Sequence, residues 1–112
     1  MPQNVEADMD KLNEWYLSLP EITFENILEY HYRFEKIHPF QDGNGRVGRL
    51  ILFRECLRNN ITPFIIDDNH KLFYYRGLKE FTNVRGYLID TCLSAQVTYK
   101  GWVNYFYGSL LN

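Results

Sequence analysis

One short stretch of the chain carries most of its chemically reactive side chains. Residues 38–49 read His-Pro-Phe-Gln-Asp-Gly-Asn-Gly-Arg-Val-Gly-Arg, so an imidazole, a carboxylate, three glycines and two guanidinium groups fall close together. Glycines just before a helix let backbone N–H groups turn toward an anion, and the amino end of a helix adds partial positive charge. Arg46 and Arg49 lie on neighbouring helical positions, from which two guanidinium groups can hold phosphate oxygens. The pattern therefore predicts a phosphate-binding site.

Asp42 and His38 add a metal ligand and a base to this prediction. Mg²⁺ is typically held by one or two carboxylates together with substrate phosphates, so Asp42 is sufficient as a protein ligand. His38 is the group in the stretch that exchanges a proton near neutral pH, which makes it the candidate general base. The plainer alternatives are a turn carboxylate, a hydrogen-bonded loop histidine, and two arginines that pair with Glu25, Glu29, Glu35 or another carboxylate.

The other two histidines are expected to have different roles. His31 falls among the apolar positions of a helical segment, so we expect it to be buried and to brace the loop. His70 lies between Asn69 and Lys71 in a polar turn, and we expect it to be exposed and without a role.

Helices must position these groups. Apolar spacing and the four prolines predict amphipathic helices on both sides of a loop at residues 37–44, and two or three more helices further along. Phe64-Ile65-Ile66 has strand-like composition but no sheet partner nearby. We therefore predict an all-α fold of five to seven helices, with the loop between two central helices. The expected helical segments are Val5–Leu19, Ile22–Lys36, Gly45–Asn59, Lys71–Phe81, Val84–Tyr99 and Trp102–Leu111.

A helical wheel at ~100° per residue divides the faces of the helix that follows the loop. Leu50, Phe53 and Leu57 share the sector of Arg46, and Cys56 falls close to Arg49. The wheel thus predicts that both arginines lie at the amino-terminal end of the core-facing side. It places Arg54, Glu55 and Arg58 on the solvated side.

Composition limits the classes of protein. The chain has 112 residues, of which 46% are hydrophobic and 17% aromatic, with a net charge of −2; this predicts a single globular domain over residues 1–112 and excludes disorder. The near-zero charge argues against a nucleic-acid partner, because dedicated nucleic-acid binders are usually basic overall. The longest apolar run, Leu50–Phe53, is far shorter than the ~20 residues that cross a bilayer, so no membrane partner is expected. Two cysteines, Cys56 and Cys92, fit a reducing, cytoplasmic location.

Residues 38–49 resemble the HPFxDGNGRxxR signature of Fic domains. Looser agreement flanks them in His31-Tyr32-x-Phe34-Glu35-x-Ile37 and Tyr74-Tyr75-x-x-Leu78. The resemblance implies an all-α fold and an Mg²⁺-dependent transfer of AMP from ATP to a Ser, Thr or Tyr hydroxyl of a protein target. A non-catalytic nucleotide- or protein-binding domain is the alternative.

The resemblance also implies roles for single residues. His38 is then the general base, Asp42 the Mg²⁺ ligand, and Arg46 and Arg49 the groups that hold the distal phosphates. Phe40 would anchor the loop in the core. Two further sets would contact the nucleotide: Gly43, Asn44 and Gly45 as the anion hole, and, by weaker analogy, Tyr75 and Leu78 beside the adenine.

Features outside the signature refine these expectations. The Doc-like kinases of the family carry Lys at the position of Gly45, so Gly45 favours nucleotidyl transfer over kinase activity. The family's inhibitory [Ser/Thr]-x-x-x-Glu motif does not occur in this sequence. The resemblance therefore suggests an inhibitor on another chain, such as the antitoxin of a toxin–antitoxin pair. The upstream helices and the β-hairpin flap of the family are expected to be lacking.

Overall fold

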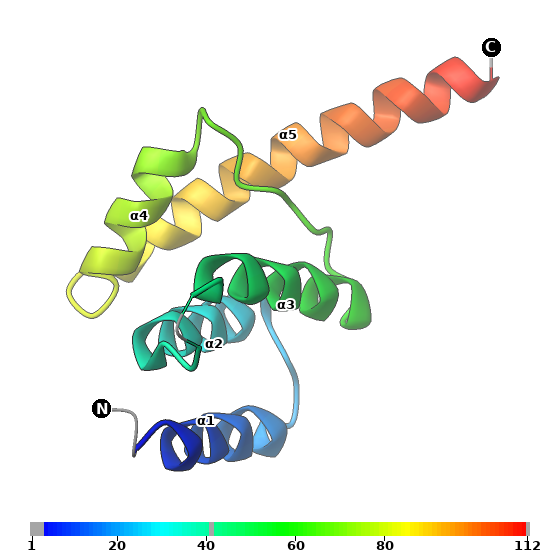
Figure 1. Ribbon diagram of the computed structural model, residues 1–112. Helices are drawn as coiled ribbons and strands as arrows, with labels where there is room; N and C mark the ends of the chain where they lie inside the picture. Colours follow the sequence, from blue (N-terminus) through cyan, green and yellow to red (C-terminus); the bar gives the residue numbers. More distant parts are fainter. Residues whose placement is uncertain (1–3, 41, 112) are drawn as a thin grey trace. The chain divides into compact units, whose positions relative to one another are not determined.

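The computed structural model describes residues 4–40 and 42–111, which form five helices and no strand (Figure 1). The loop that carries the signature joins the second helix to the third. This confirms the predicted all-α fold and the predicted place of the loop. The helices are α1 (Val5–Ser18), α2 (Phe24–Ile37), α3 (Asn44–Arg58), α4 (Lys71–Glu80) and α5 (Arg85–Leu111). None of them, within the described residues, is both long and apolar enough to cross a membrane.

The chain divides into two compact units, Met1–Ile61 and Thr62–Asn112. The first contains α1, α2 and α3, and the second contains α4 and α5. Each unit is described by itself below. The assignment of both units to a single domain stays a prediction.

In the first unit, α2 packs against both α1 and α3. A capping box starts α2: the Thr23 hydroxyl accepts from the Asn26 amide at 3.2 Å, and the Thr23 amide donates to Asn26 Oδ1 at 2.9 Å. The buried face of α2 includes His31, as predicted, and Leu12 and Tyr16 of α1 join it in the core. That face consists of Ile27, Leu28, His31 and Phe34.

The predicted orientation of α3 is wrong for the sector of Arg46, which is exposed, but Cys56 is buried on the core-facing side as predicted. Leu50 and Leu57 are exposed, whereas Gly48, Leu52 and Cys56 form the buried face. The wheel missed Gly48 because it counts apolar side chains. Gly48 instead lets α2 approach, since a Cβ added to it would lie 2.7 Å from Glu35 Oε1.

Glu55 is likewise not on the solvated side, where the wheel placed it. It is buried and accepts a hydrogen bond from the Tyr16 hydroxyl at 2.8 Å. Arg58 Nε lies 3.5 Å from its Oε1. The partners on α1 and α3 offset the cost of burying the charge. Arg54 and Arg58 remain largely exposed, as predicted.

In the second unit, α4 packs closely on α5. A Cβ added to Gly77 would lie 2.7 Å from Leu88 Cα, so the two backbones approach because position 77 has no side chain. Tyr74, Leu88 and Cys92 are buried at this contact. The helix α5 is continuous where two helices were expected, because one interior glycine, Gly101, costs only ~1 kcal/mol. Phe64–Ile66 is irregular and forms no strand.

Candidate active site

His38 ends α2 and faces solvent. Its backbone is left-handed, with φ 59° and ψ 59°, and its amide donates to the Phe34 carbonyl at 3.1 Å. Histidine is among the side chains that tolerate this conformation, and Pro39 cannot continue the helix. The imidazole is exposed, so a hydroxyl group arriving from solvent can reach it.

Asn44 holds the loop in shape. The Phe40 amide donates to Asn44 Oδ1 at 2.8 Å, and Asn44 Nδ2 donates to the Phe40 carbonyl at 2.7 Å. The buried side chain of Asn44 is thus engaged with the loop backbone, which leaves its own amide as its means of lining an anion hole. Phe40 was expected to be buried in the core, but it is 50% exposed. Its ring centroid lies 6.5 Å from that of Phe34. The loop is anchored through the backbone of Phe40.

The start of α3 presents backbone amides. Gly43 precedes the helix at φ 74°, a conformation that favours glycine, and no side chain caps the helix. The first hydrogen bond of the helix is donated by the Val47 amide to the Gly43 carbonyl at 3.0 Å. The amides of residues 44–46 therefore come before the first intrahelical bond, where helices bind anions.

The two arginines flank these amides. Arg49 folds back along α3, and its Nη1 lies 3.0 Å from the position of a Cβ added to Gly45. This places a guanidinium group over the first turn of the helix. Arg46, on that first turn, is exposed, and no carboxylate of the described residues forms an ion pair with it.

Glu35 is the carboxylate that joins the site from α2. Burial raises the pKa of Glu35 above its usual value, while electrostatic interactions with Arg49 and with His38 act to lower it. Of the three glutamates left open by the sequence, Glu35 therefore faces the site, whereas Glu29 lies 3.6 Å from Arg33. The sequence could have predicted this position, because Glu35 lies one helical turn before His38 and therefore on the same face of the helix.

His31 supports the helix that carries the arginines. It is buried, and its Nδ1 lies 3.2 Å from the Gly48 carbonyl oxygen. Burial lowers its pKa to about 4, so the ring is neutral near pH 7 and donates Nδ1–H to that carbonyl. The contact is with α3, one turn beyond the loop that His31 was expected to brace.

Asp42 is an exposed carboxylate beside the start of α3. The described residues contain no group of three or more His, Cys, Asp or Glu side chains that could hold a metal ion unaided. This donor set fits Mg²⁺ that is shared with nucleotide phosphates rather than a cage made of protein groups.

The residues predicted beside adenine belong to the second unit. Tyr75 and Leu78 lie on α4, where Tyr75 is 47% exposed and Leu78 is partly exposed. Their role at the nucleotide stays a prediction.

The first unit thus presents an exposed imidazole at the end of α2, free backbone amides at the start of α3, and two arginines on the first turns of α3, one of them folded over Gly45. Residues 1–55 match the model of the Fic/DOC family, and through this segment the chain belongs to that family. The match includes all of the signature residues 38–49.

Curated relatives agree with this family. The protein adenylyltransferase Fic of Nematostella vectensis is 35% identical over 92 residues, covering 78% of this chain and 22% of the relative. The protein of the same name from Aedes aegypti is 33% identical over 82 residues, covering 70% of this chain and 16% of the relative. The protein of the same name from Culex quinquefasciatus is 44% identical over 49 residues, covering 44% of this chain and 10% of the relative. The chain therefore spans about a fifth or less of the length of these relatives.

Proposed function

We propose that this chain is a protein adenylyltransferase that moves AMP from ATP to a Ser, Thr or Tyr hydroxyl of a protein target. The observation that carries the proposal is the position of Arg49 over Gly45, beside the amides that start α3 and the exposed His38 that ends α2. Family membership and the names of the relatives support it.

In the proposed reaction, His38 acts as the general base. Its imidazole takes the proton of the target hydroxyl while the hydroxyl oxygen forms a bond to the α-phosphorus of ATP. The bond from that phosphorus to the bridging oxygen breaks, and pyrophosphate leaves. The exposure of His38 suits this role, because the hydroxyl belongs to another protein.

The start of α3 holds the phosphates. The amides of residues 44–46 and the guanidinium groups of Arg46 and Arg49 neutralise charge on the triphosphate and on the departing pyrophosphate. Asp42 would hold Mg²⁺ against the same phosphates, and the ion would supply further charge neutralisation there. Since position 45 has no side chain, Arg49 can lie against the helix backbone next to the phosphates.

Partners and location follow from the proposal. The acceptor is a hydroxyl-bearing segment of a protein, and an inhibitory chain of the antitoxin kind would act by occupying Arg46 or Arg49. We place the reaction in the cytoplasm, where ATP is present and where a reducing environment fits a chain with only two cysteines, Cys56 and Cys92.

Labelled ATP tests the proposal. The purified chain is incubated with a cell lysate, Mg²⁺ and ATP labelled at either the α- or the γ-phosphate. We expect label to enter protein from the α position only, and not with the His38→Ala variant. Label from the γ position alone would indicate a kinase. Binding of ATP with no transfer from either position would instead favour the non-catalytic nucleotide-binding alternative.

A further inference from the structure

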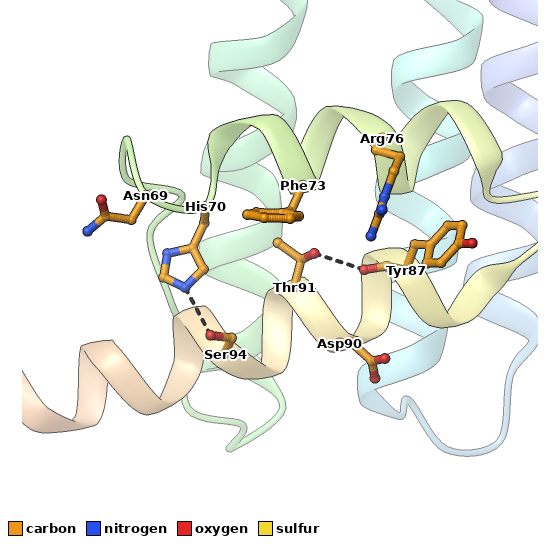
Figure 2. Close-up of a pocket in the computed structure, with 8 residues that line it drawn as sticks. All are labelled: Asn69, His70, Phe73, Arg76, Tyr87, Asp90, Thr91 and Ser94. Atoms are coloured by element: carbon orange, nitrogen blue, oxygen red, sulfur yellow. Dashed lines mark hydrogen bonds between the residues drawn. The ribbon is translucent and has the colours of Figure 1, made fainter.

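The second unit has a cleft of its own, between α4 and α5. Its volume is about 350 Å³, which is enough for a small organic molecule. Figure 2 shows His70 and Ser94 at one end, the Phe73 ring in the middle, and Arg76 and Tyr87 at the other end. None of these residues belongs to the proposed adenylyl-transfer site.

Three polar side chains at the first end form a hydrogen-bonded chain. His70 Nδ1 lies 2.6 Å from Asp67 Oδ1, and His70 Nε2 lies 3.0 Å from Ser94 Oγ. With the proton on Nδ1 donated to the carboxylate, Nε2 is left to accept the Ser94 proton. His70 is thereby only partly exposed, contrary to the sequence expectation.

Asp67 is held in place as the orienting group. Asp67 Oδ1, which is hydrogen-bonded to the imidazole, also accepts a hydrogen bond from the His70 backbone amide at 3.1 Å. These hydrogen bonds lower the pKa of Asp67 below its ordinary value, which keeps it a carboxylate. A nucleophile, a base bonded to it and an orienter bonded to the base are the three parts by which an activated serine is recognised.

We propose that Ser94 is a base-assisted nucleophile that accepts an acyl group from a small activated ester bound in this cleft. Ser94 Oγ forms a bond to the ester carbonyl carbon, and its proton passes to His70 Nε2. The carbon–oxygen bond to the alcohol then breaks, and the leaving alkoxide takes the proton from His70. The exposed Phe73 ring provides an apolar wall for the ester.

The helix sets a limit on this chemistry. Ser94 lies within α5, where the backbone amides are already bonded along the helix, so the amides of its own helix provide no oxyanion hole. We therefore expect one round of acylation with slow release of the acyl group. The proposal is independent of the function of the first unit.

A covalent probe tests the proposal on the whole chain. An alkyl fluorophosphonate bonds to a nucleophilic serine through phosphorus with loss of fluoride, and peptide mass spectrometry locates it. Ser109 is a matched internal control, because it is also exposed on α5. We expect Ser94 to react roughly 100-fold faster than Ser109, the scale of general-base assistance. Equal rates at the two serines would overturn the proposal.

Two variants separate activation from a structural tie between α4 and α5. His70→Gln and Asp67→Asn should each slow labelling of Ser94 at least about tenfold while circular dichroism shows an intact fold. Should His70→Gln fail to fold, Asp67→Asn decides, since it keeps a side chain of the same size. Undiminished labelling in a folded variant would mean that the chain of hydrogen bonds is only structural. An initial burst with p-nitrophenyl acetate, absent in Ser94→Ala, is the further expected result.

Discussion

The signature loop of the first unit and the α4–α5 cleft of the second are built in opposite ways. The loop gathers its groups from consecutive residues, and its geometry comes from the backbone: a left-handed His38, a left-handed Gly43 and an arginine folded over Gly45. The cleft joins Asp67 and His70, which precede α4, to Ser94 of α5 through side-chain hydrogen bonds. Chemistry that depends on local backbone is visible in a sequence, whereas chemistry that depends on helix packing is not.

The largest expected effect is the loss of the base in the loop. His38→Ala should lower AMP transfer by about 10² to 10⁴-fold, the range for a general base, and leave ATP affinity nearly unchanged. Transfer is measured with α-labelled ATP and affinity by calorimetry. Lys79→Ala, an exposed position on α4, is the control and should transfer normally. Full transfer by His38→Ala would show that the loop works without its imidazole.

The buried histidine of the first unit makes stability depend on pH. Its folded pKa of about 4 lies below the ordinary 6.5, so the unfolded chain binds more protons between these values. The contribution of His31 to the free energy of unfolding is therefore complete above about pH 6.5. It is lost as the pH drops toward 4, which lowers the free energy of unfolding by roughly 3 kcal/mol.

Urea unfolding between pH 4 and 7 measures this dependence for the chain and for His31→Gln. The raised pKa of Glu35 acts in the opposite sense, because there the folded chain binds more protons. Comparison with the variant isolates the histidine. A slope that is equal in both proteins would contradict the assignment of His31 as neutral and buried.

Glycine substitutions compare the packing of the two units. Gly77→Ala should destabilise by about 2 kcal/mol, because the added Cβ meets the backbone of Leu88 at 2.7 Å. Gly48→Ala should cost about 1 kcal/mol, since the group it meets is the movable carboxylate of Glu35. Thermal unfolding gives both values. Gly101→Ala, with open space around its Cβ, should instead stabilise by up to ~1 kcal/mol. The reverse order for Gly77 and Gly48 would contradict the packing described for α4 and α5.

The smallest effect is expected at Gly45. A Cβ there would lie 3.0 Å from Arg49 Nη1, so the guanidinium must move by a few tenths of an ångström. We expect Gly45→Ala to weaken the binding of inorganic triphosphate roughly threefold, about 0.7 kcal/mol. Calorimetry with Gly86→Ala as the open-space control measures it. Tighter binding would mean that Arg49 does not contact the anion from this position.

The sequence predicted what local rules determine. Prolines and apolar spacing predicted the helices that flank the loop, and a contiguous motif predicted the candidate site. The orientation of α3 was missed because Gly48 packs through the absence of a side chain. Glu55 was missed because Tyr16, its partner, lies on another helix. His70 lies in a turn as predicted, but it was expected to be exposed because its partner Ser94 is distant in the chain.

The central claim is that the triphosphate lies at the start of α3 beside His38. A ¹⁵N NMR titration of the chain with Mg²⁺ and a non-hydrolysable ATP analogue tests it most directly. The account predicts that the amides of Gly45 and Arg46 and the side-chain Nε of Arg49 shift, while those of His70 and Ser94 in the cleft do not. Shifts confined to the cleft, with none at the start of α3, would contradict it.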